Sequence, residues 1–140
     1  MNRIIDNIKI GTVGELLVQL RLLEHNIHAA PPLKDSGNDL IAIKGKSFRA
    51  IQVKTTARGN FKRPESSRLF HILAVVHLDY DVNMVHLDSS SIFLIPRDQI
   101  AAVSTRIKDL EAFRMTPDHV KKLFEASSPP TLGSKKGATK

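Results

Sequence analysis

A long apolar run at residues 69–78 most constrains what this chain can fold into. Its centre, residues 72–76, reads Ile-Leu-Ala-Val-Val, with no polar residue to mark an exposed side. A continuous apolar run of this kind predicts a strand that is buried on both faces within a sheet. The chain has 140 residues, enough for a single domain around such a strand.

A β-hairpin is predicted shortly before this run. Leu40–Ile43 and Phe48–Thr55 are apolar segments joined across the short basic turn 44–47, Lys-Gly-Lys-Ser. The preceding cluster at residues 35–38, Asp-Ser-Gly-Asn, has the composition of a turn, and with the two prolines before it we expect residues 28–37 to be irregular.

The first helix is predicted over Gly11–Asn26. Glu15 lies beside an apolar row with Val18 and Leu22, an awkward place for a free charge. A carboxylate near a helix N-terminus is also favoured by the helix dipole, so a purely structural role for Glu15 stays open. We expect the buried stripe to follow the helical spacing of Val13, Leu16, Leu17, Leu20 and Leu23.

The C-terminal half is predicted to add shorter elements. Thr116 precedes a proline and is predicted to cap the closing helix, whose apolar stripe holds Val120, Leu123 and Phe124. From residue 127 the chain is rich in Ser, Pro, Gly and Lys, so we expect one domain over residues 1–126 and a disordered basic tail over 127–140. Between the hairpin and this helix we expect short strands at Met84–Leu87 and Ser91–Ile95 and a short helix at Asp98–Val103.

Three polar residues on the hairpin form a candidate site. Gln52 and Lys54 are two positions apart and therefore point to the same face of their strand. Asp39 lies directly before the other strand of the hairpin. This arrangement can hold a divalent metal beside an ammonium group. Two ordinary alternatives remain open at this point: a solvated hairpin face for Gln52 and Lys54, and a turn residue for Asp39.

Together with Glu15 on the preceding helix, the pattern Gly37-x-Asp39, Gln52-Val53-Lys54 resembles the PD-(D/E)XK nuclease superfamily. It is similar to the subset with Gln in place of the second acidic residue, and to small endonucleases that resemble Holliday-junction resolvases. The resemblance covers roughly residues 12–95. It implies an α/β fold with a restriction-endonuclease-like core, an α-β-β-β-α-β mixed central sheet flanked by helices.

The resemblance also implies roles for the site residues. The metal ligands would be Asp39, the side-chain oxygen of Gln52, the backbone carbonyl of Val53 and, directly or through water, Glu15. Lys54 would orient the attacking water and offset charge at the phosphate. The implied cofactor is Mg²⁺, with Mn²⁺ as a substitute. Because an amide carries no net charge, we expect metal binding to be weak until a substrate phosphate joins.

The charge of the chain favours polyanionic partners. Lys and Arg outnumber Asp and Glu by 21 to 14, giving a net charge of +7 and a pI near 9.9. A merely solvated basic surface is the alternative. Contacts to the DNA backbone are assigned to Thr55, Thr56, Arg58, Lys62 and Arg63.

The expected function is a metal-dependent DNA endonuclease that hydrolyses phosphodiester bonds and recognises DNA structure rather than sequence. A homodimer would let two active sites address two strands. Two alternatives stay open: a non-catalytic nucleic-acid-binding module, and an interaction protein that reuses the fold. The chain has no cysteine, which excludes thiol catalysis and cysteine zinc sites. It has no leader pattern and no run of 18 apolar residues, so we expect a cytoplasmic protein without a membrane partner.

Six histidines require a separate check. His71 and His77 lie at even spacing on the central strand and His86 follows on the next strand, so a cluster is conceivable. None of these positions shows the spacing of known zinc sites. We therefore expect hydrogen-bonded strand residues or secondary DNA contacts.

Overall fold

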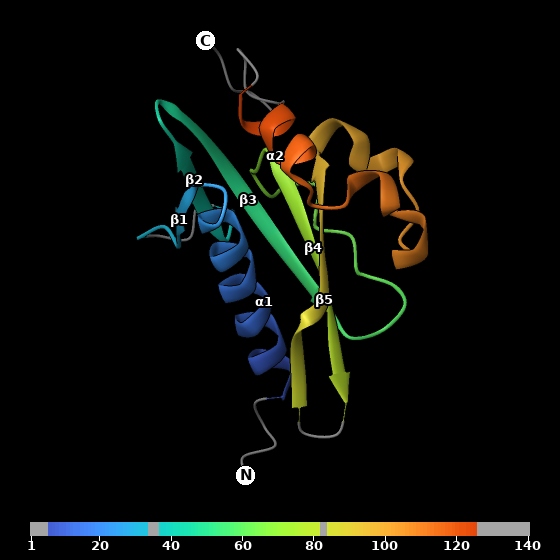
Figure 1. The fold of residues 1–140 in the computed structure, drawn as a ribbon. Helices are drawn as coiled ribbons and strands as arrows, with labels where there is room; N and C mark the ends of the chain where they lie inside the picture. Colours follow the sequence, from blue (N-terminus) through green and yellow to red (C-terminus); the bar gives the residue numbers. More distant parts are fainter. Residues whose placement is uncertain (1–5, 34–36, 82–83, 126–140) are drawn as a thin grey trace.

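The computed structural model describes residues 6–33, 37–81 and 84–125, with side chains from Lys9 onward. The predicted tail, residues 127–140, lies outside the described residues. The described chain forms a five-stranded mixed sheet with helices on both sides (Figure 1). The elements in chain order are α1 (Asp6–Leu23), β1 (His28–Ala30), β2 (Leu40–Lys44), β3 (Ser47–Thr56), β4 (Ile72–Asp81), β5 (Met84–Pro96), the 3-10 helices η2 (Arg97–Ala102), η3 (Ile107–Asp109) and η4 (Glu111–Phe113), and α2 (Pro117–Phe124).

The sheet has the strand order β1-β2-β3-β4-β5, and only β3 and β4 run parallel. A parallel pair needs a crossover connection, and here residues 57–71 supply it without a helix. The run at residues 72–76 is buried throughout, as predicted for a strand covered on both faces, although β4 begins at Ile72 and extends to Asp81. The predicted α/β class with a mixed sheet flanked by helices is confirmed.

Two hydrophobic cores lie on opposite faces of the sheet. The first core contains Ile51 and Val53 of β3 and the buried side of α1. The second core contains Ala50 of β3 and is covered by the crossover segment and the 3-10 helices. Because side chains alternate along a strand, Gln52 and Lys54 share the face of the second core. Figure 1 shows α1 on one side of the sheet and the crossover segment with the 3-10 helices on the other.

Helix α1 turns a different side to the sheet from the one predicted. The expected buried stripe is wrong at Leu16, Leu20 and Leu23, whose side chains are exposed by 57%, 49% and 49%. The fully buried residues on this helix include Val18 and Leu22, the row that also holds Glu15. The helix also begins earlier than predicted and ends at Leu23. No helix of the described part has both the length and the hydropathy to cross a bilayer.

A close approach between α1 and β3 explains this orientation. A Cβ atom built on Gly14 would lie 1.8 Å from Oγ1 and 2.8 Å from Cβ and Cγ2 of Thr55. Only a glycine allows the helix backbone to come so near to the strand. The sequence signal for this contact is a small residue directly before Glu15, and sequence reasoning did not use it.

We expect Gly14→Ala to destabilise the protein by about 1–3 kcal/mol, as overpacking does in a close-packed core. The added methyl group must push α1 away from β3, which outweighs the better helix propensity of alanine. Thermal or urea unfolding measures the loss. Thr55→Ala removes the hydroxyl and methyl groups that clash, so it should recover part of the loss in the double variant. The contact would be contradicted if Gly14→Ala lowered the free energy of unfolding equally in the wild-type and the Thr55→Ala background.

Three other elements differ from the prediction. Strand β1 forms at the edge of the sheet, where an irregular segment was predicted, and pairs with β2 through three residues. The two predicted strands near residues 84–95 form one strand, β5, with an irregularity in its pairing to β4 between His77 and Asp79. The helix predicted at Asp98–Val103 is the 3-10 helix η2.

The closing helix α2 follows the predicted start signal. The hydroxyl of Thr116 accepts a hydrogen bond from the backbone N–H of His119 at 3.2 Å, and Pro117 occupies the first helical position. Val120, Leu123 and Phe124 are buried in the first core. The predicted cap is confirmed, because the hydroxyl satisfies a backbone N–H that has no partner within the helix.

Candidate functional site

Asp39 lies directly before β2, and its carboxylate is hydrogen-bonded to β3. Its backbone N–H donates to the carbonyl of Ile51 at 2.9 Å, and its Oδ2 accepts a hydrogen bond from the N–H of Val53 at 2.8 Å. The preceding turn is held by Asn38, whose side-chain amide donates to the carbonyl of Leu40 at 2.9 Å. Gly37 takes a φ of 88°, which favours glycine. The carboxylate therefore has a fixed position rather than that of a free turn residue.

The backbone carbonyl of Val53 faces the same side of β3 as its N–H. Both backbone groups of one strand residue point to the same neighbouring strand, and the N–H of Val53 points at Asp39. The last β2–β3 pair joins Leu40 and Ile51. Beyond Ile51, β3 has no pairing partner in β2. The carbonyl of Val53 thus points to this unpaired edge of β3, on the side of the Asp39 carboxylate.

Gln52 carries a buried oxygen without a partner. Its side chain is only 6% exposed, and its Oε1 has no hydrogen-bond partner among the described residues. Buried polar atoms are normally hydrogen-bonded, so an exception of this kind requires a physical explanation. Lys54 follows on the same face and is partly buried. A buried amide oxygen without a hydrogen-bond donor can accept a cation instead.

Glu15 comes to this region from α1. Burial, and second the negative charge of Asp39, raise the pKa of the Glu15 carboxyl above its ordinary value. The repulsion from Asp39 means that the carboxyl groups from α1 and β2 lie near each other. Carboxylate, amide and carbonyl oxygens are the hard oxygen ligands that Mg²⁺ prefers.

No group of three or more His, Cys, Asp or Glu residues in the described segments could hold a metal ion. A metal site among these residues would need ligands of other types as well. His71 is a structural residue, because its Nδ1 accepts the N–H of Ala50 at 2.8 Å and its ring packs edge-on against Phe48. Burial, and second the charge of Arg49, lower the pKa of His71.

The residues assigned to DNA contacts lie in different surroundings. The hydroxyl of Thr55 is buried against Gly14, and the hydroxyl of Thr56 accepts the N–H of Arg58 at 3.0 Å. The guanidinium of Arg63 donates to two backbone carbonyls, at 2.6 and 2.5 Å. Arg58 and Lys62 are exposed, and they remain available for phosphate contacts.

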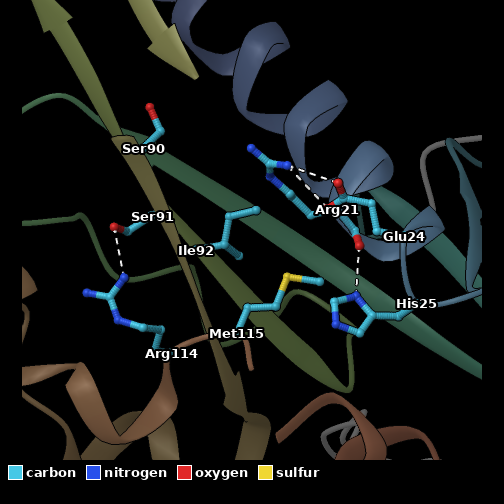
Figure 2. Close-up of a pocket in the computed structure, with 8 residues that line it drawn as sticks. All are labelled: Arg21, Glu24, His25, Ser90, Ser91, Ile92, Arg114 and Met115. Atoms are coloured by element: carbon cyan, nitrogen blue, oxygen red, sulfur yellow. Dashed lines mark hydrogen bonds and ion pairs between the residues drawn. The ribbon is translucent and has the colours of Figure 1, made fainter. Parts of the chain in front are cut away.

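A separate pocket lies between the end of α1, β5 and the segment before α2 (Figure 2). The arginines that line this pocket are already paired with carboxylates. Arg21 donates to Glu24 at 3.1 and 3.2 Å, and Arg114 donates to Ser91 at 3.1 Å and is also paired with Glu111. This balance gives the pocket no excess charge with which to attract a phosphate.

No protein-family model and no curated protein matches this chain. Among solved structures, the chain is similar to one described as "The structure of a bacterial homing endonuclease: I-Ssp6803I". The TM-score is 0.50 and the sequence identity 19%, and the match covers 70% of each chain. At this identity the similarity shows a shared fold alone.

Proposed function

We propose that this protein is a metal-dependent DNA endonuclease of the PD-(D/E)XK type. The observation that carries the proposal is the buried Oε1 of Gln52, which has no partner among the described residues. Gln52 lies on β3 next to Val53, whose N–H binds the carboxylate of Asp39, and its side chain shares a face of β3 with that of Lys54. The shared fold with a homing endonuclease supports the same class of chemistry at the level of architecture.

The residues present fit a Mg²⁺ ion. Asp39, Gln52 and the carbonyl of Val53 would hold it, and Glu15 would join directly or through a water. When bound, Mg²⁺ supplies charge neutralisation at the phosphate and lowers the pKa of a bound water. With only two carboxylates in the set, we expect affinity for the free ion to be low, and a DNA phosphate to complete the site.

The protein groups have separate tasks in this proposal. The N–H of Val53 holds one oxygen of Asp39, so that the other oxygen, Oδ1, is left for the metal. Lys54 presents an ammonium group beside the scissile phosphate, where it orients the attacking water and offsets the charge that develops on the phosphate oxygens. Glu15 would add the second negative charge from α1.

Recognition of DNA structure rather than sequence is part of the proposal. The test uses a four-way junction, a nicked duplex and an intact duplex of matched sequence, each with Mg²⁺, Mn²⁺ or chelator. We expect cleavage with either metal, none in chelator, and a preference for the interrupted substrates. Cleavage that continues in chelator would exclude a metal-dependent mechanism.

The principal rival is a non-catalytic nucleic-acid-binding module with the same fold. Calorimetric titration of Mg²⁺ separates the two. A nuclease should bind the ion more tightly when DNA is present, because the phosphate supplies ligands. A binding module should show no metal isotherm with or without DNA, and an interaction protein should bind neither metal nor DNA at moderate salt.

A further inference from the structure

Two segments far apart in the sequence pair as a short antiparallel ribbon on the face of the second core. Asn60 pairs with Arg106, the N–H of Phe61 donates to the carbonyl of Thr105, and the N–H of Ile107 donates to the carbonyl of Gly59, both at 2.9 Å. We refer to residues 58–62 and 104–108 as the basic ribbon.

The basic ribbon is anchored by apolar side chains and presents polar ones. Phe61 and Ile107 are buried in the second core. Their neighbours Asn60, Lys62 and Arg106 are exposed, as expected where side chains alternate between the two faces of an extended chain. Lys108, in the 3-10 helix η3 at the end of the second segment, is exposed as well.

Two arginines link the segments that flank the ribbon. Arg63 donates to the carbonyls of Ile100 and Val103, at the end of η2. Arg97 donates to the carbonyl of Ser66 at 2.8 Å, and its guanidinium lies 4.2 Å from the centre of the Phe70 ring. These bonds hold residues 63–66 and 97–103, the segments next to the ribbon, against each other.

The exposed charge on the ribbon is almost all positive. Arg58, Lys62, Arg106 and Lys108 are exposed, and one nearby carboxylate, that of Asp109, lies 3.8 Å from Nε of Arg106. Both side chains of that pair are well exposed, by 61% and 43%. Exposed pairs of this geometry are weak, so the pair does not neutralise the ribbon as a phosphate-binding surface.

We propose that the basic ribbon binds the backbone of a DNA duplex. The proposal rests on the proposed function, because the ribbon covers the sheet face that carries Gln52 and Lys54. It adds Arg106 and Lys108, from a segment without any site residue, to the phosphate contacts. It also assigns Arg63 to the support of the ribbon rather than to a phosphate.

Duplex binding in chelator, where no cleavage occurs, tests the ribbon by itself. Each of Lys62→Ala, Arg106→Ala and Lys108→Ala should weaken binding severalfold for every sequence and reduce the slope of log K against log salt by about 0.9. The matched control is Lys122→Ala, which removes an exposed lysine from α2, a helix packed in the other core. It should leave the slope unchanged.

The outcomes separate the ribbon from the proposed function. The ribbon proposal would be overturned if the three ribbon variants, with their fold confirmed by circular dichroism, gave the same slope of log K against log salt as Lys122→Ala. This would hold even if the protein cleaves DNA. Reduced slopes in a protein that never cleaves would support the ribbon and contradict the nuclease. Absence of duplex binding by the wild type at low salt would also overturn the ribbon proposal.

Discussion

Replacement of Asp39 by asparagine is expected to reduce the cleavage rate at least about a hundredfold while leaving the fold intact. The amide oxygen of the substituted side chain can still accept the hydrogen bond from the N–H of Val53, so the hairpin edge keeps its contact. The negative charge that would hold the metal is lost. Initial cleavage rates at saturating Mg²⁺ measure the effect, and thermal unfolding checks the fold.

Two further variants sharpen this result. Asp39→Ala also removes the acceptor of the Val53 N–H, which should lower stability by about 1–3 kcal/mol beyond the Asp39→Asn variant. Asp98→Asn, at an exposed acid on η2, is the matched control and should cleave at the wild-type rate. A rate for Asp39→Asn close to that of the control would remove Asp39 from the site.

The predicted hairpin and its site residues depend on local signals. Period-two alternation along β3 places Gln52 and Lys54 on one face, and the glycine turn before Asp39 fixes where β2 begins. These patterns can be read within a few residues of each other. For the same reason the cap of α2 by Thr116 was predictable from four consecutive residues.

The orientation of α1 could not be predicted from periodicity. The helix has apolar residues on more than one side, so that both the predicted stripe and the row of Val18 and Leu22 satisfy helical spacing. The contact of Gly14 with Thr55 decides between them, and it joins residues on two distant elements. Because that contact turns Glu15 toward the sheet, the position of a candidate catalytic residue depends on a nonlocal packing detail.

The basic ribbon was not predictable for a related reason. Its two segments, residues 58–62 and 104–108, are far apart in the chain, and neither alternates clearly enough to indicate extended pairing. Charge alone also failed to distinguish Arg63 from Lys62, since only the structure reveals that the guanidinium of Arg63 donates to backbone carbonyls. The sequence shows the excess of positive charge, and tertiary contacts determine which basic side chains are free at the surface.

Gln52→Glu is expected to strengthen metal binding and to make the stability of the protein depend on the metal. In chelator, a carboxylate in place of the buried amide of Gln52 should lower the melting temperature, because a buried charge is poorly solvated. With Mg²⁺ the added charge faces a cation. Even a well-screened ion pair is worth about 1 kcal/mol, so Kd should fall about fivefold.

The matched control is Gln52→Met, which has a similar volume and no oxygen. It removes the buried oxygen that lacks a partner among the described residues, so stability in chelator should be equal to or above that of the wild type. The shift of melting temperature with Mg²⁺ should then be largest for Gln52→Glu, intermediate for the wild type and absent for Gln52→Met. If Gln52 is only a buried strand residue, the added charge destabilises the protein equally with and without Mg²⁺. Identical metal isotherms for the three proteins would therefore rule out Gln52 as a ligand and favour the non-catalytic alternative.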